Sequence, residues 1–167
     1  MKPAVDLDQG LELVARYGAP ERWIAVLVTL RPDGEPSTSL VNAGILTHPV
    51  TGERVVAFVA RGRTAKLANL RGRPRATLVV RAGWEWVAVT GPVELAGPDD
   101  EMPGLGLGLD GGGVPRLLRE VFHAAGGTHD NLHVYDEVMA AERRTAVLLH
   151  PDRFVTNPAG TDHKEHR

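Results

Sequence analysis

The sequence predicts a mainly β protein, built as a small closed or split barrel of antiparallel strands. Short apolar runs recur between clear turn signals, as is typical of strands. Most neighbouring runs are joined by a few residues, which favours an antiparallel meander with one inserted helix. Residues 55–59 are apolar at every position, so both faces of that strand must be covered. A barrel with helices or a second subunit on its outer side satisfies this requirement.

The first part of the chain is expected to form one helix and three strands. Apolar residues from Leu7 to Val14 recur at helical spacing after Asp6, a candidate helix cap. Strands are expected at residues 23–30, 37–46 and 54–59. The sequence Pro-Asp-Gly at 32–34 predicts a tight turn, because proline presets φ and glycine tolerates positive φ.

The rest of the chain is expected to add helices and complete the sheet. The predicted elements are helices at residues 64–70, 115–125 and 132–143, and strands at 76–81, 84–95, 145–149 and 153–155. We expect a single domain over residues 1–156, with an N-terminal helical segment at 1–22. Residues 96–144 would form a Gly-rich loop followed by helices, and residues 157–167 a mobile polar tail.

Composition limits the function classes that are open to this chain. The 167 residues carry a formal net charge of −2 and contain no cysteine. Disulfides, thiolate nucleophiles, iron–sulfur clusters and cysteine-based zinc sites are therefore excluded. The longest apolar run, at 23–30, is far shorter than the ~18 residues of a membrane span, and the first residues lack the apolar core of a signal peptide. We expect a cytoplasmic protein that acts without a membrane.

The most informative segment is residues 60–81, which carries no acidic residue. Its basic residues are Arg61, Arg63, Lys66, Arg71, Arg73, Arg75 and Arg81. A strand that ends in basic residues and leads into a helix offers backbone N–H groups, the positive end of a helix dipole and cations together. Because the whole chain is weakly acidic, this local concentration predicts an anion site centred on Arg61, Arg63, Thr64 and Lys66.

Other interpretations of these patterns stay open. The basic segment is also compatible with a solvated surface. Nucleic acid is disfavoured as its ligand, because the chain is acidic overall and no aromatic residues alternate with the arginines. Residues 37–44 alternate small hydroxyl side chains with apolar ones, which would leave backbone and small polar groups open to a flat ligand. The same pattern also suits a half-buried strand without any ligand.

Two further motifs resemble functional signatures but lack the context that these require. The glycine pattern at residues 106–111 matches a dinucleotide loop, but a Pro-rich acidic segment precedes it instead of a strand. His129 and His133 are four residues apart, yet the glutamate of a zinc-protease helix is replaced by Asp130. We interpret Asp130 or Asn131 as a helix cap and assign no metal.

Several segments resemble those of one known family. These are residues 39–46 followed by 48–52, residues 61–71 followed by 74–76, and residues 135–144. They are similar to the flavin/deazaflavin oxidoreductases with a pyridoxamine-phosphate-oxidase-like split barrel. The last segment resembles the actinobacterial branch that uses coenzyme F420. Together the resemblance covers residues 23–155.

The resemblance implies a six-stranded antiparallel split β-barrel that forms a homodimer with cofactor sites at the subunit interface. Coenzyme F420 is the implied cofactor, with FMN as the alternative. The implied binding residues are Ser37, Thr38, Ser39, Val41 and Asn42 at the ring, and Ala60, Arg61, Arg63, Thr64 and Lys66 at the phosphate. The implied reaction transfers a hydride to a small enone, quinone or tetrapyrrole-like acceptor, with no identified catalytic residue. An FMN-dependent reductase and a non-catalytic F420-binding protein are the alternatives.

Charge adds a weak preference between the two cofactors. Coenzyme F420 carries an oligoglutamate tail, which an extended basic track suits better than the compact FMN needs. Arg71, Arg73 and Arg75 could continue that track beyond the phosphate. The Gly-rich segment at 97–113 departs from the family pattern.

Overall fold

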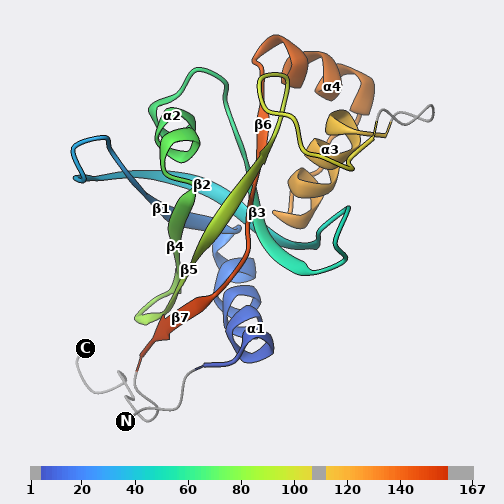
Figure 1. Cartoon of the computed structure of the whole chain (residues 1–167). Helices are drawn as coiled ribbons and strands as arrows, with labels where there is room; N and C mark the ends of the chain where they lie inside the picture. Colours follow the sequence, from blue (N-terminus) through green and yellow to red (C-terminus); the bar gives the residue numbers. More distant parts are fainter. Residues whose placement is uncertain (1–4, 107–111, 158–167) are drawn as a thin grey trace.

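The computed structural model describes residues 5–106 and 112–157. Six antiparallel strands form a closed barrel, which confirms the predicted mainly β class (Figure 1). They are β1 (Ile24–Leu30), β2 (Pro36–Thr47), β3 (Arg54–Ala60), β4 (Arg75–Ala82), β5 (Glu85–Ala96) and β6 (Thr145–Leu149). Their order is β4-β1-β2-β3-β6-β5, and pairing between β4 and β5 closes the ring. A short seventh strand, β7 (Arg153–Thr156), pairs with β5 on its outer edge.

Helices cover the barrel at three places. Their bounds are α1 (Leu7–Gly18), the 3₁₀ turn η1 (Ala19–Glu21), α2 (Ala65–Gly72), α3 (Val114–Ala124) and α4 (Leu132–Ala141). The Asp6 side chain accepts a hydrogen bond from the Gln9 N–H at 2.8 Å and thereby caps α1, as the sequence predicts. Figure 1 shows α1 below the barrel, α2 above β1 and β2, and α3 with α4 on the other side. None of the described helices is both long and apolar enough to span a membrane.

β3 has covered faces on both sides, as its continuous apolar sequence predicts. Val56 and Phe58 point into the barrel, where they join one buried cluster. Val55 and Ala57 point outward and pack with Leu117, Leu118 and Val121 of α3 in a second cluster. All four β3 side chains are 0% exposed, so α3 supplies the outer cover that a strand of this composition needs.

The last predicted helix ends earlier than expected. The apolar periodicity predicts a helix at residues 132–143, whereas α4 ends at Ala141. Arg143 has a φ of 49°, and a residue in the left-handed region stops a right-handed helix. At the other end, the Asn131 side chain accepts hydrogen bonds from the His133 and Val134 N–H groups, which confirms the expected cap. Residues 107–111 of the predicted Gly-rich segment and residues 158–167 of the predicted polar tail lie outside the described residues.

Candidate functional site

The barrel is split along β2. Residues 36–42 of β2 pair with β1, whereas residues 43–47 pair with β3. Within the described chain, the second edge of β2 therefore has no strand partner from Pro36 to Asn42. Because Ala43 pairs with Phe58, β3 ends beside Val41, and residues 61–64 leave β3 next to this open edge. Backbone N–H and C=O groups are thus available beside the basic segment.

The predicted ring-lining residues divide between the two faces of β2. Ser37, Ser39 and Val41 face the barrel side, and Val41 is buried in its core. Thr38 and Asn42 face outward, where both are exposed. The Asn42 Nδ2 donates to the backbone oxygen of Arg22 at 3.0 Å. A flat ligand at this edge could therefore contact the backbone and the side chains of one face of β2. It could not contact the barrel-side and the outward-facing side chains at the same time.

The predicted phosphate residues follow β3 directly. Ala60, the last residue of β3, is buried and pairs with Thr145 of β6. The Thr64 hydroxyl donates to the Arg61 carbonyl oxygen at 2.9 Å, so it braces the loop instead of capping α2. No side chain of the described residues caps the first N–H groups of α2. These groups remain available for an anion.

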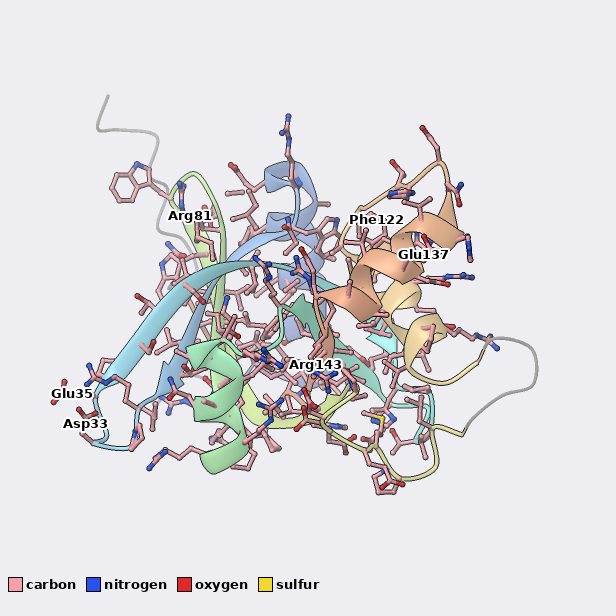
Figure 2. The ribbon with its side chains drawn as sticks, turned by 90° about the horizontal axis from the view of Figure 1, so that it is seen from above. Asp33, Glu35, Arg81, Phe122, Glu137 and Arg143 are labelled. Carbon is pink, nitrogen blue, oxygen red and sulfur yellow. The ribbon has the colours of Figure 1, made fainter. Side chains whose placement is uncertain are left out.

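The loop before α2 is held by the junction between α4 and β6, which begins at Glu142. The Gly62 N–H donates to the Glu142 carbonyl oxygen at 3.1 Å. Arg63 has a φ of 59°, a left-handed conformation that a non-glycine residue adopts at a cost. Figure 2 shows Arg143, which belongs to the same junction, on the side of α4 that faces α2.

The cations at this site have few partners within the protein. The Arg61 side chain is 65% exposed, and its Nη2 lies 3.9 Å from Glu142 Oε1, at the limit of an ion pair. Arg63 and Lys66 make no ion pair with any carboxylate of the described residues. Burial lowers the pKa of Lys66, and the nearby positive charge of Arg144 lowers it further. A bound anion would compensate this positive charge, so the residues present fit a phosphate group.

The remainder of the basic segment is engaged elsewhere. Arg71 pairs with Asp100 at 2.6 Å, and Arg75 pairs with Asp152 at 2.7 Å. Arg73 donates to the backbone oxygen of Pro32 at 3.2 Å. The predicted track of free arginines beyond the phosphate site is therefore largely neutralised by acidic residues from distant parts of the chain.

The sequence analysis did not identify the acidic residues that shape the site. Glu142 lies beside Arg61, and Asp99 forms a two-bond ion pair with Arg143. This pairing with Arg143 holds the pKa of Asp99 below its ordinary value. The charged run at 142–144 overlaps the end of the helix predicted at 132–143 and follows the observed α4. Nothing in that run indicates which loop it will meet.

A different group of residues could be taken for a metal centre. His48 Nε2, a Glu94 carboxylate oxygen and a His150 nitrogen lie within 4.8 Å of one another. However, His48 Nδ1 accepts hydrogen bonds from the Val50 and Thr51 N–H groups, so its proton is on Nε2 and is donated to Glu94 at 2.9 Å. Only His150 and Glu94 remain as ligands, fewer than the three protein ligands of a typical zinc site. We assign this cluster to a hydrogen-bonded turn.

His129 and His133, which are four residues apart in the sequence, make contacts with different neighbours. His129 lies before α4, and its Nδ1 accepts from the Asn131 N–H at 3.0 Å. His133 Nε2 lies 3.2 Å from Glu137, one turn further along α4. The two rings therefore serve separate local contacts.

Comparisons with solved structures support the fold. Rv2991, a conserved hypothetical protein from Mycobacterium tuberculosis, is 17% identical; the match covers 93% of this chain and 88% of that chain, with a TM-score of 0.63. An F420 reductase is 18% identical, with 80% and 90% coverage and a TM-score of 0.52. An FMN-binding protein related to pyridoxamine 5'-phosphate oxidase, from Nostoc punctiforme, is 15% identical, with 86% and 79% coverage and a TM-score of 0.54. A heme-binding protein from Mycobacterium smegmatis also matches.

At these identities the structural matches establish a shared fold. No curated protein matches the sequence. The family model for pyridoxamine 5'-phosphate oxidase matches residues 15–105, which include β1 to β5 and the basic segment. That match spans more than half of the sequence, and the chain therefore belongs to the pyridoxamine 5'-phosphate oxidase family.

Proposed function

We propose that this protein is a coenzyme F420-dependent oxidoreductase that reduces a small organic acceptor, such as an enone, a quinone or a tetrapyrrole. One observation carries the proposal. The uncapped start of α2, with Arg63 and Lys66, lies where the chain leaves β3 beside the unpaired edge of β2. A phosphate site and an open strand edge at one split suit a redox cofactor that joins a phosphate to a flat ring.

Each part of the site has a separate role in this proposal. Arg61, Arg63, Lys66 and the first N–H groups of α2 bind the phosphate. The backbone of β2 residues 37–42 orients the ring by hydrogen bonds. When bound, the deazaflavin supplies the hydride, and the protein contributes position and electrostatics. The Thr64 hydroxyl keeps the loop in shape through the Arg61 carbonyl.

The choice of F420 over FMN is the finer part of the proposal. An F420 reductase and an FMN-binding protein both share the fold. The exposed Arg61 favours a cofactor that extends beyond its phosphate, because it offers charge on the outer side of the loop. The ion pairs of Arg71 and Arg75 reduce the support that an extended basic track would give. FMN therefore stays the alternative cofactor.

The proposal includes a homodimer. The outer face of β1 and β2 exposes Ile24 (45%), Val26 (39%) and Leu40 (67%). Val26 pairs directly with Leu40 and, on its other side, with Val79 of β4, so the apolar side chains are contiguous. A second copy would bury this face and close over the open edge of β2.

Titration of the purified protein with coenzyme F420 and with FMN, followed by tryptophan fluorescence, tests the proposal. We expect F420 to bind, and Arg63→Gln and Lys66→Gln each to weaken it about tenfold, because hydrogen bonds to charged groups contribute about 1.5–3 kcal/mol. Arg31→Gln, at the distant β1–β2 hairpin, is the matched control. Tight FMN binding with yellow fluorescence would instead favour the FMN reductase. Binding of neither cofactor would reject both.

A further inference from the structure

An open cleft of about 530 Å³ lies between the start of β1 and the end of α3. Trp23 and Phe122 provide aromatic walls, and Asn42 of β2 contributes to the lining. Phe122 is labelled in Figure 2, on α3. The cleft shares Asn42 with the stretch of β2 that we propose to contact the cofactor ring. It therefore lies directly beside the proposed ring site.

The backbone at the edge of this cleft is strained. Arg22 and Trp23 are consecutive, and they have φ values of 57° and 59°. Such residues persist only where the surrounding structure fixes them, and they concentrate at ligand sites. Here Asn42 Nδ2 holds the Arg22 carbonyl at 3.0 Å, and the Ala43 N–H holds the Trp23 carbonyl at 2.8 Å.

The Trp23 ring is fixed by close packing. A Cβ atom added at Gly18 would lie 2.9 Å from the ring, so this neighbour must remain small. A Cβ atom at Gly126 would likewise lie 3.1 Å from the ring. The strained dipeptide thus presents a fixed indole and the Arg22 side chain at the cleft.

Three polar side-chain groups of the cleft have no partner in the described part of the protein. The Arg22 guanidinium is within ion-pair distance of no described carboxylate. The Trp23 Nε1–H has no hydrogen-bond acceptor among the described residues, and the Asn42 Oδ1 has no donor there. Ligand sites typically combine apolar walls with a few such convergent polar groups. A cation and an indole N–H in a cleft that is also lined by two aromatic rings suit a flat ligand that carries a carboxylate.

We propose that this cleft is the acceptor subsite, and that it takes a planar, conjugated carboxylic acid. The inference rests on the proposed function, because it needs the cofactor ring at the adjacent edge of β2. Trp23 and Phe122 contact the planar part of the acceptor, and Arg22 binds the carboxylate. Arg22 is a binding residue of the acceptor and has no contact with the cofactor phosphate.

The test uses 2-naphthoate as the probe and 2-naphthamide as its neutral counterpart. In a protein with Trp84→Phe and Trp86→Phe, Trp23 is the sole tryptophan, and its fluorescence reports binding. We expect quenching by 2-naphthoate, weaker binding of 2-naphthamide, and about a tenfold loss of naphthoate affinity in Arg22→Gln. Arg31→Gln, at another exposed arginine that lies outside the cleft, should bind the probe normally. Ala19→Phe, which fills the cleft from an exposed position, should also abolish binding.

Binding of the coenzyme separates this inference from the proposed function. Arg22→Gln should bind coenzyme F420 with unchanged affinity. Equal loss of coenzyme and naphthoate would assign the cleft to the cofactor and overturn the inference. Absence of naphthoate binding, or unchanged binding in Arg22→Gln, would also overturn it. Arg22-dependent naphthoate binding in a protein that binds no coenzyme would support the ligand class while rejecting the proposed cofactor.

Discussion

Gly62 packs directly against the backbone of Arg143. A Cβ atom added at Gly62 would lie 2.6 Å from the Arg143 carbonyl oxygen, which is closer than two such atoms can approach. The Gly62 N–H also donates to the Glu142 carbonyl oxygen. The loop that leads into α2 is therefore shaped by a residue pair that is far apart in sequence, and the position of Arg61 and Arg63 depends on it.

Gly62→Ala is expected to destabilise the protein and weaken phosphate binding. The added methyl group meets backbone, which cannot rotate away, and overpacking of this kind costs about 1–3 kcal/mol. Urea unfolding and coenzyme titration measure both effects. Gly72→Ala, at the end of α2, is the control, since an added Cβ there meets nothing within 4 Å. Equal stability of the two variants would contradict the packing argument.

Lys66 is expected to make stability depend on pH in the alkaline range. Its pKa in the folded protein is lowered from 10.5 by burial and by Arg144, so between the two values the unfolded chain holds more protons. Stability should therefore rise with pH through this window in the absence of ligand. Lys66→Met should remove the contribution of Lys66 to this increase in the free energy of unfolding, as measured by urea unfolding from pH 8 to 10.5. Bound phosphate should favour the charged amine and reduce the dependence.

Asp100→Asn is expected to strengthen binding of a coenzyme with an oligoglutamate tail. The change releases the Arg71 guanidinium, in the last turn of α2, from its ion pair. An increase of up to about fivefold at low salt corresponds to ~1 kcal/mol, the upper range for an exposed pair. FMN affinity should not change. Asp33→Asn, at the hairpin tip that is far from Arg143 in Figure 2, is the matched control. An equal gain for FMN would indicate a general charge effect.

Leu40→Lys is expected to convert the proposed dimer into a monomer. Leu40 is 67% exposed on the apolar outer face, next to Val26, and a lysine there would place two charges across the interface. Sedimentation velocity reports the change in mass, and coenzyme titration reports whether the partner contributes to the site. Val138→Lys, on an exposed apolar position of α4, controls for surface charge. A wild-type protein that sediments as a monomer would refute the dimer.

Arg22→Gly is expected to stabilise the protein while it removes acceptor binding. Glycine adopts a φ of 57° without the strain of about 1–3 kcal/mol that other residues have in the folded protein. Glycine also gives the unfolded chain more conformational entropy, which lowers stability by about 0.4–1 kcal/mol. A net gain of about 1 kcal/mol should appear in urea unfolding. A loss of stability would show that the Arg22 side chain contributes packing that the structure does not reveal.

The sequence predicts the barrel well because strands and turns have local signals. The continuous apolar run of β3 even predicts its second covered face, now occupied by α3. The pairing of Arg71 with Asp100 could not be predicted, since it depends on which loop returns to α2. The left-handed conformations of Arg22, Trp23 and Arg143 could not be predicted either, because these positions carry neither glycine nor asparagine, the residues that usually adopt them. Tertiary contacts fix those conformations.

The unpaired edge of β2 has a consequence for handling the protein. Within the described residues, Pro36 to Asn42 offer a row of backbone groups beside the exposed Leu40. Such an edge is a template for strand addition by other chains and promotes aggregation. A cofactor or a second copy of the chain that covers this edge would therefore protect the protein from aggregation. Recombinant yield should accordingly improve in a host that makes the matching coenzyme, and empty protein should precipitate first on concentration.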